Sequence, residues 1–323
     1  MKYNLSGWIK QNHDSRDRVL RFSRRELLAL SPTTDLQKGM GPQLNQGDEG
    51  SCGPHTAVEM IEFDQILQGS PVVQPSRNQI YYACRTLMGT TGSDSGVDNR
   101  TLLKSLAQFG YAPESLWPYT DADMLTNPPA SVWQAALPFK ISNYAAVPQD
   151  LNSMKATISG GHPFMFGFSV FQQMMSDAAA ATGIIADPSG SSIGGHDVTY
   201  MGYSDVDAPG VLPGNKWPAG TFKFRNHWLN ADGTPWGDGG YGYISYAYST
   251  NPSYASDFWV INSVNIGAQP SPQPSPQPVP SGLILTLSAA EDAGQIMILG
   301  GGRISMGSFS GPVPAGRYNL VAQ

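Results

Sequence analysis

A proline-rich stretch near the C-terminus divides this chain of 323 residues. Residues 269–278 read QPSPQPSPQP, which cannot build a core and favours a stiff polyproline II spacer. We therefore expect folded structure on either side of a linker. The predicted divisions are an N-terminal segment (1–28), a body (29–267), the linker (268–280) and a small C-terminal module (281–323).

Two apolar runs predict β-structure in the C-terminal module. LILTL at 283–287 and QIMIL at 295–299 are typical of strands, and GGG at 300–302 is typical of a turn. A unit this short buries little apolar surface, so we expect it to need a surface or an assembly partner. No residue pattern in this module indicates a particular ligand. Its sequence leaves open a binding module, an attachment arm to a cell surface or virion, and a poorly ordered extension.

The body carries helical patterns first and strand patterns second. Apolar spacing predicts helices over 52–69, from residue 76 onward, over 99–109 and over 149–158. Aromatic and β-branched runs predict strands over 163–170, 196–203, 221–226, 241–244 and 258–261. On the first helix, the expected buried face consists of Met60, Phe63, Ile66 and Leu67. This order favours an α+β body of two subdomains with a cleft between them.

Charge and composition argue against several classes of partner. The net charge is −6, the pI is about 5.3 and no basic stripe occurs, so we expect no nucleic-acid partner. No stretch reaches the roughly 20 apolar residues that membrane crossing requires. The N-terminus has no apolar core of a secretory signal. Metal-ligating residues are not clustered and no nucleotide loop occurs, so we expect no cofactor.

The N-terminal segment, residues 1–28, is polar and rich in Arg and Asp. It is expected either to block the cleft or to pack on the body, and packing is the favoured arrangement. Trp8 is the natural anchor in both cases, because an indole brings a large apolar area and one hydrogen-bond donor.

The two cysteines differ in their setting. Cys52 lies in QGDEGSCGP at 46–54, at the predicted start of a helix, where the helix dipole stabilises a thiolate. Gln46, in the same stretch, offers an amide donor for an oxyanion. Cys84 lies inside a helical pattern and is interpreted as a buried small hydrophobic residue. Cys52 is therefore the candidate nucleophile.

A thiol nucleophile needs a base, and the chain has five histidines. His196 follows two glycines and opens a strand, so its ring can reach into the cleft. His55 lies on the helix that follows Cys52, where a structural role is expected. His227 should point opposite to the residue before it if its stretch stays a strand. His13 lies in the polar N-terminal segment and His162 at a turn, which leaves His196 as the candidate base.

Four motifs occur in order along the body: EGSCG at 49–53, GGHDV at 194–198, RNHW at 225–228 and PWGDGGY at 235–241. His196 lies 144 residues after Cys52 and 30 residues before Asn226. This set resembles the papain-like cysteine peptidases. Their bacterial and viral branch is also similar to this chain at GWI (7–9), DSG (94–96) and PESLWPY (113–119). The resemblance covers residues 7–264 and does not extend to the C-terminal module.

The resemblance implies a papain-like fold, with a helical left subdomain and a β-barrel-like right subdomain. It implies a thiol endopeptidase that needs no metal or cofactor and acts on polypeptide substrates. Cys52 would attack the carbonyl as a thiolate, His196 would form the ion pair and protonate the leaving amine, and Asn226 would orient the imidazole. Gln46 and the backbone N–H of Cys52 would form the oxyanion hole.

Four further residues are expected at the substrate site: Ser95, Gly96, Gly195 and Trp228. Ser95 and Gly96 lie in a loop that resembles the one whose backbone pairs with an extended substrate. Trp228 would shield the hydrogen bond between the imidazole and Asn226 from water.

The chain departs from the family pattern at four positions, with Glu49 for a cysteine, Gly53 for an aromatic residue, Asp197 for an alanine and His227 for a serine. These departures leave the catalytic positions intact. Two alternatives remain open. One is a catalytically silent papain-like protein that binds peptides. The other is a Cys-His cell-wall amidase, a class that is shorter and lacks the Asn-x-Trp and Trp-Gly motifs.

Overall fold

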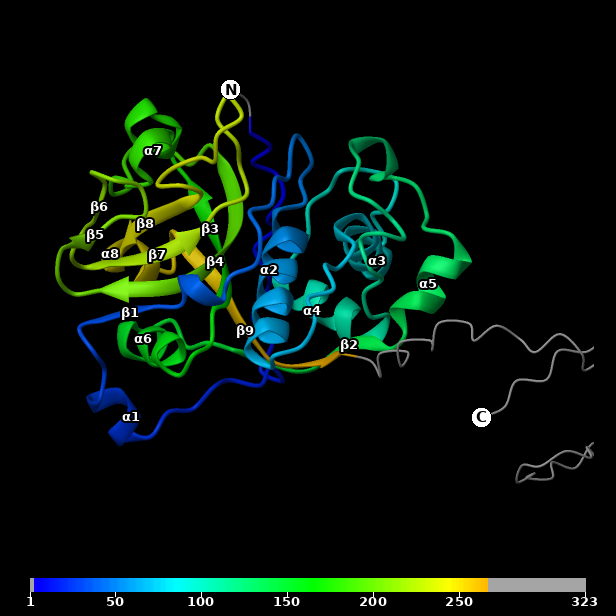
Figure 1. Cartoon of the computed structure of the whole chain (residues 1–323), viewed down its shortest axis with the longest axis horizontal. Coiled ribbons are helices and arrows are strands. Elements are labelled where there is room, and N and C mark those ends of the chain that lie inside the picture. Colours follow the sequence, from blue (N-terminus) through cyan, green and yellow to red (C-terminus); the bar gives the residue numbers. More distant parts are fainter. Residues whose placement is uncertain (1–2, 267–323) are drawn as a thin grey trace, which may run out of the picture. The chain divides into compact units, whose positions relative to one another are not determined.

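The computed structural model describes residues 3–266 (Figure 1), so the calls on the linker and the C-terminal module lie outside the described residues. Its α-helices are α1 (Arg24–Leu28), α2 (Cys52–Leu67), α3 (Arg77–Met88), α4 (Asn99–Gln108), α5 (Ala130–Ala136), α6 (Leu151–Ser159), α7 (Asp177–Thr182) and α8 (Tyr246–Thr250). Its strands are β1 (Thr33–Asp35), β2 (Phe139–Ala146), β3 (Phe164–Val170), β4 (Gly194–Ser204), β5 (Ala208–Pro209), β6 (Lys216–Trp217), β7 (Thr221–Arg225), β8 (Tyr241–Ser245) and β9 (Ala255–Ile266). The expected α+β class is confirmed.

The main sheet is antiparallel in the order β2-β9-β3-β4-β7-β8, and β1 pairs with β4. Strand β9 is 12 residues long and pairs with β3 at one end and with β2 along the other. It therefore runs from the strand-rich subdomain to the helical one. Helices α3, α4 and α5 gather on one side of the body together with β2, strands β1 and β3 to β8 lie on the other side, and α2 lies between the two groups (Figure 1).

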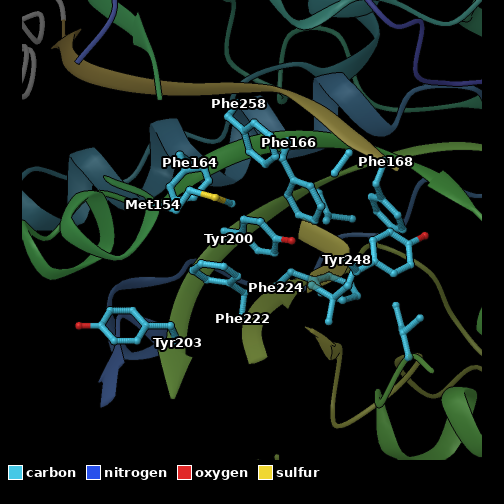
Figure 2. Packing of buried hydrophobic residues seen from close by; sticks show 14 of the residues in the cluster. Met154, Phe164, Phe166, Phe168, Tyr200, Tyr203, Phe222, Phe224, Tyr248 and Phe258 are labelled. Carbon is cyan, nitrogen blue, oxygen red and sulfur yellow. The ribbon is translucent and has the colours of Figure 1, made fainter. Parts of the chain in front are cut away.

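Each subdomain has its own core. The strand-rich core is aromatic, and in it Phe166 stacks on Tyr200 with ring centroids 3.6 Å apart, beside Phe224 and Phe258 (Figure 2). The helical core joins α2, α3 and α4 to the far part of β9 through Trp259. Buried aromatic rings contribute strongly to the stability of a core. The two clusters therefore stabilise the strand-rich subdomain and the helical subdomain, and α2 begins between these two subdomains.

The predicted helices and strands of the body are largely confirmed, with local differences. The helix expected from residue 149 begins at Leu151, because the carboxylate of Asp150 accepts the N–H of Ser153 as an N-cap. Ser76 caps α3, but the side chain of Gln79 turns away from the cap to Gly110 and Ala112.

One residue on the predicted buried face of the first helix is exposed, and four strands were not predicted: β1, β2, β5 and β6. Leu67 is 63% exposed, because α2 is buried nearly all round over its first three turns and only its last turn reaches solvent. Strand β2 (FKISNYAA) alternates too weakly to be predicted, and it is defined by its pairing with β9 more than 110 residues later. Among the helices of residues 3–266, none is long and apolar enough to cross a membrane.

Candidate active site

Cys52 is the first residue of α2 and is fully buried. The loop before it is fixed from both sides. The backbone N–H of Gln46 donates to the carbonyl of His227 at 2.9 Å, and the N–H of Gly50 donates to the carboxylate of Asp94 at 2.9 Å. The thiol therefore lies at the start of a helix, as predicted, and at the positive end of the α2 dipole.

His196 and Asn226 are brought together from two neighbouring strands. His196 is the third residue of β4, and Asn226 follows the last residue of β7. Nε2 of His196 lies 3.0 Å from Oδ1 of Asn226. Because Oδ1 also accepts the N–H of His227 at 2.9 Å, we assign the ring proton to Nε2. Nδ1 of His196 is then a lone-pair acceptor, and it is buried with no hydrogen-bond partner among the described residues.

The side chain of Gln46 is held in one orientation. Its Oε1 accepts from Nδ1 of His227 at 2.8 Å and from Nε1 of Trp228 at 3.1 Å. Its Nε2 donates to the carbonyl of Glu49 at 2.8 Å. An amide nitrogen carries two hydrogens, so one N–H of Gln46 remains for a further acceptor.

The N-terminal strap, residues 3–11, lies across this site. Gly7 is buried against the thiol, and a Cβ added to it would lie 2.5 Å from Sγ of Cys52. On the helical side, Val97 donates to the carbonyl of Gly7 at 2.9 Å and accepts from Ile9 at 3.0 Å. On the strand side, Gly195 donates to the carbonyl of Leu5 at 2.7 Å. The favoured expectation for this segment, packing on the body away from the cleft, is wrong for residues 3–9, because extended backbone pairs with both walls.

The four residues expected at the substrate site have different neighbours. Gly96 and Gly195 both meet the strap, and a Cβ at Gly96 would lie 2.3 Å from the carbonyl oxygen of Ser6. The side chain of Ser95 is directed to Thr90 and not to the strap, since its hydroxyl donates to Oγ1 of Thr90 at 2.8 Å.

Trp228, the fourth of these residues, packs on the imidazole itself. Its ring stacks on His196 and on Tyr3 of the strap, in each case with ring centroids 4.2 Å apart. This packing restricts the access of water to the imidazole.

Burial favours the neutral forms of the two candidate catalytic groups, Cys52 and His196. Burial raises the pKa of the Cys52 thiol, and the nearby carboxyl of Asp197 adds to the increase. Burial also lowers the pKa of His196 to about 3, against the opposing effect of its bond to Asn226. Both shifts have the same cause, which is the exclusion of water around the site. The expected thiolate–imidazolium pair is therefore disfavoured while the strap is in place.

Two residues beside the site were not anticipated. His227 was expected to point opposite to Asn226, but β7 ends at Arg225 and strand alternation does not continue. Its ring lies 5.1 Å from that of His196. Asp197 faces α4 and accepts from Asn99 at 2.5 Å. The only signal in the sequence was that both differ from the family's usual residues.

His55 has the structural role that was expected. It is fully buried, its Nδ1 lies 2.9 Å from the carbonyl of Ser51, and its Nε2 lies 3.1 Å from the carbonyl of Asn45 and 3.3 Å from Nη1 of Arg77. A neutral ring has one N–H, so Nδ1 can donate to Ser51 while Nε2 accepts from Arg77. His55 therefore ties the start of α2 to the preceding loop.

Comparisons with known proteins identify the family of the chain. Residues 32–260 match the family model described as papain family cysteine protease. An uncharacterized peptidase C1-like protein of Acanthamoeba polyphaga mimivirus is 30% identical, with 80% of this chain and 86% of that protein covered. The crystal structure of xylellain, a cysteine protease from Xylella fastidiosa, matches with a TM-score of 0.70 and 30% identity, covering 81% of this chain and 97% of that one.

A more distant structure shares the fold. Procathepsin B S9 from Trypanosoma congolense matches with a TM-score of 0.58 and 19% identity, over 75% of this chain and 80% of that one. The family model extends over both subdomains, and the viral relative and the bacterial structure each cover at least 80% of the chain. The chain belongs to the papain family of cysteine proteases.

Proposed function

We propose that this protein is a cysteine endopeptidase in which Cys52 is the nucleophile, His196 the base and Asn226 the residue that orients the imidazole. The observation that carries the proposal is the 3.0 Å contact between Nε2 of His196 and Oδ1 of Asn226, which leaves Nδ1 as the free acceptor. A fixed tautomer with one free lone pair is what a general base requires.

The proposed reaction has two stages. Nδ1 of His196 takes the proton of Cys52, and the thiolate attacks the peptide carbonyl carbon. The free N–H of Gln46 and the backbone N–H of Cys52 stabilise the oxyanion, and the imidazolium gives its proton to the leaving amine. Water then loses a proton to His196 and attacks the thioester, which releases the acid product and restores the thiol.

We also propose that the described state is latent. The strap places Gly7 against Sγ of Cys52, and its backbone occupies the hydrogen-bonding groups of Val97 and Gly195 that a substrate would use. The same burial keeps the thiol protonated. Displacement of the strap would expose both walls and bring water to the reacting groups.

Hydrolysis of a mixed peptide library tests the proposal. Full-length Trp8→Ala, in which the strap loses its anchor, is compared with Trp8→Ala/Cys52→Ala and Trp8→Ala/Cys84→Ala. Cys84 is the matched control, because it is equally buried but lies in α3 among apolar residues of the helical core. We expect cleavage by the first and third variants and none by the second. Cleavage that survives in the Cys52→Ala variant would contradict the proposal. No cleavage by any variant would favour a silent peptide-binding protein.

The domain plan remains part of the proposal. We propose a peptidase domain that ends near residue 267, a linker over 268–280 and a separate module over 281–323. A division of the chain into units 1–269 and 270–323 supports this plan.

A further inference from the structure

The nucleophile loop, residues 46–51, carries Gln46 at one end and leads into Cys52 at the other. No disulfide braces this loop, because both cysteines of the chain are free and Glu49 stands where the family pattern has a cysteine. On the strand side, the backbone N–H and the side chain of Gln46 tie the loop to His227. On the helical side, non-covalent contacts alone hold it.

The hydroxyl of Tyr119 joins the two ends of the nucleophile loop. It donates to the backbone carbonyl of Gln46 at 2.6 Å and lies 2.7 Å from the hydroxyl of Ser51. A phenol has one hydrogen and a carbonyl only accepts, so we assign the hydrogen of the second bond to Ser51. The carbonyl of Gln46 also accepts from the N–H of Glu49, but at a longer 3.4 Å. Tyr119 is therefore the closer of these two donors.

Tyr119 is itself held at its ring and at its backbone. Cζ of Arg77, the first residue of α3, lies 4.3 Å from the ring centroid, and the ring of His55 meets it edge-on with centroids 4.9 Å apart. The backbone N–H of Tyr119 donates to Oε1 of Glu114 at 2.9 Å, and the same oxygen pairs with Arg77 at 2.5 Å. Glu114 and Tyr119 belong to the motif PESLWPY (113–119), which the proposed reaction does not use.

The phenol of Tyr119 keeps its proton. Burial raises the pKa of Tyr119, and the neighbouring carboxyl of Glu49 adds to the increase. The hydroxyl therefore remains a donor to Gln46 throughout the neutral pH range. A group that does not exchange its proton in this range orients a neighbour but does not act as a general acid or base.

We propose that Tyr119 is a positioning residue for the oxyanion hole, and that its hydroxyl fixes the nucleophile loop so that the free N–H of Gln46 and the backbone N–H of Cys52 meet at one oxyanion. The inference rests on the proposed peptidase function and adds a residue that does not itself touch the reacting atoms. Donors held in place before the reaction stabilise developing charge without reorganisation, so a small displacement of the loop weakens them.

The test compares two tyrosine-to-phenylalanine changes in full-length Trp8→Ala. Tyr119→Phe removes the hydroxyl from the nucleophile loop. Tyr111→Phe is the matched control, because its hydroxyl is buried in the helical core and accepts from Gln65 at 3.2 Å. We expect Tyr119→Phe to lower kcat by roughly 5- to 100-fold, the range for two lost hydrogen bonds, with KM nearly unchanged. Tyr111→Phe should keep the kcat of its background.

A second readout separates positioning of the oxyanion hole from a structural role. Alkylation of Cys52 by iodoacetamide forms no oxyanion, so its rate and its pH profile should be the same in Tyr119→Phe as in the Trp8→Ala background. The affinity for a peptide aldehyde, whose adduct places an oxygen in the hole, should fall in parallel with kcat. Alkylation that slows as much as kcat, or an unchanged kcat with a raised KM, would overturn the inference and leave the peptidase function standing.

A double-mutant cycle with Gln46→Ala tests the coupling between the two residues. Gln46→Ala alone should lower kcat by roughly 100- to 1,000-fold, as expected for the loss of one oxyanion donor. Adding Tyr119→Phe should then cost no more than about a further 3-fold, because the donor that Tyr119 positions is already absent. Losses that multiply in full would overturn the inference.

Ser51→Ala guards against a folding defect in Tyr119→Phe, because it removes one of the two hydroxyl bonds with a smaller change in volume. It should lower kcat by roughly 2- to 10-fold with alkylation of Cys52 unchanged. No fall in kcat in either variant would overturn the inference. If Trp8→Ala cleaves nothing and a thiol-reactive epoxide does not label Cys52, the peptidase function fails and the inference fails with it.

Discussion

Gly7 lies directly against Sγ of Cys52, with room for no further atom between them, since a Cβ on Gly7 would approach the sulfur to 2.5 Å. The same Cβ would lie 2.8 Å from the carbonyl oxygen of Gly50. A side chain at position 7 would therefore clash with both the thiol of Cys52 and the backbone of Gly50. The closed state requires glycine there.

Gly7→Ala should open the site. The added methyl group cannot be accommodated, and overpacking of this kind costs about 1–3 kcal/mol. We expect the second-order rate of Cys52 alkylation to rise by roughly tenfold or more in the full-length protein. Ser6→Ala, a change at the exposed neighbour, is the control and should leave the rate near that of the wild type. Equal rates for Gly7→Ala and wild type would show that the strap does not protect the thiol.

The pH dependence of labelling should change with the strap. In the closed state the raised pKa of Cys52 and the pKa of about 3 at His196 keep both groups neutral near pH 7, so labelling should rise steadily with pH. In Gly7→Ala, water reaches both groups and the ion pair can form, which adds thiolate at low pH. We expect the gain to be larger at about pH 5–6 than at about pH 9, which lies above the usual Cys pKa of about 8.5. A gain that is the same at every pH would contradict this account.

His227→Ser should lower kcat more than it raises KM. His227 donates to Oε1 of Gln46 at 2.8 Å, and this bond helps to direct the amide N–H toward the oxyanion. Loss of a single positioning bond of about 0.5–1.5 kcal/mol predicts a fall in kcat of roughly 2- to 10-fold. Steady-state kinetics in the Trp8→Ala background measure it. An unchanged kcat with a raised KM would mean that His227 acts only on ground-state binding.

Glu62→Gln should stabilise the protein at alkaline pH. Both carboxylate oxygens of Glu62 are buried without a hydrogen-bond partner among the described residues, and burial raises the pKa of this group from 4.5 to about 7. The folded state then holds a proton that the unfolded state has released between these two pH values, so stability falls as pH rises through that window.

Urea unfolding at pH 4.5 and pH 8 checks this prediction. Glu62→Gln should lose less stability than the wild type between the two pH values, by about 1–3 kcal/mol. Asp177→Asn, at an exposed carboxylate, should follow the wild type. Identical pH slopes for Glu62→Gln and wild type would mean that the group is not buried as a neutral acid.

Local sequence rules predicted the start of α2 at Cys52 and the strands that carry His196 and Asn226, because caps, glycines and alternation act within a few residues. The motifs then indicated which of five histidines pairs with Asn226. Long-range relationships were not accessible. Strand β2 is defined by its pairing with β9, and the path of the strap by its backbone bonds to Val97 and Gly195.

Covalent labelling of full-length Gly7→Ala by a thiol-reactive epoxide tests the central claim most directly, with the modified residue located by peptide mapping. The account predicts one label per chain, on Cys52, with parallel loss of peptide hydrolysis and no label on the buried Cys84. It also predicts that His196→Ala abolishes the labelling at neutral pH. Labelling of Cys52 that proceeds unchanged without His196, or hydrolysis that continues after full labelling, would contradict it.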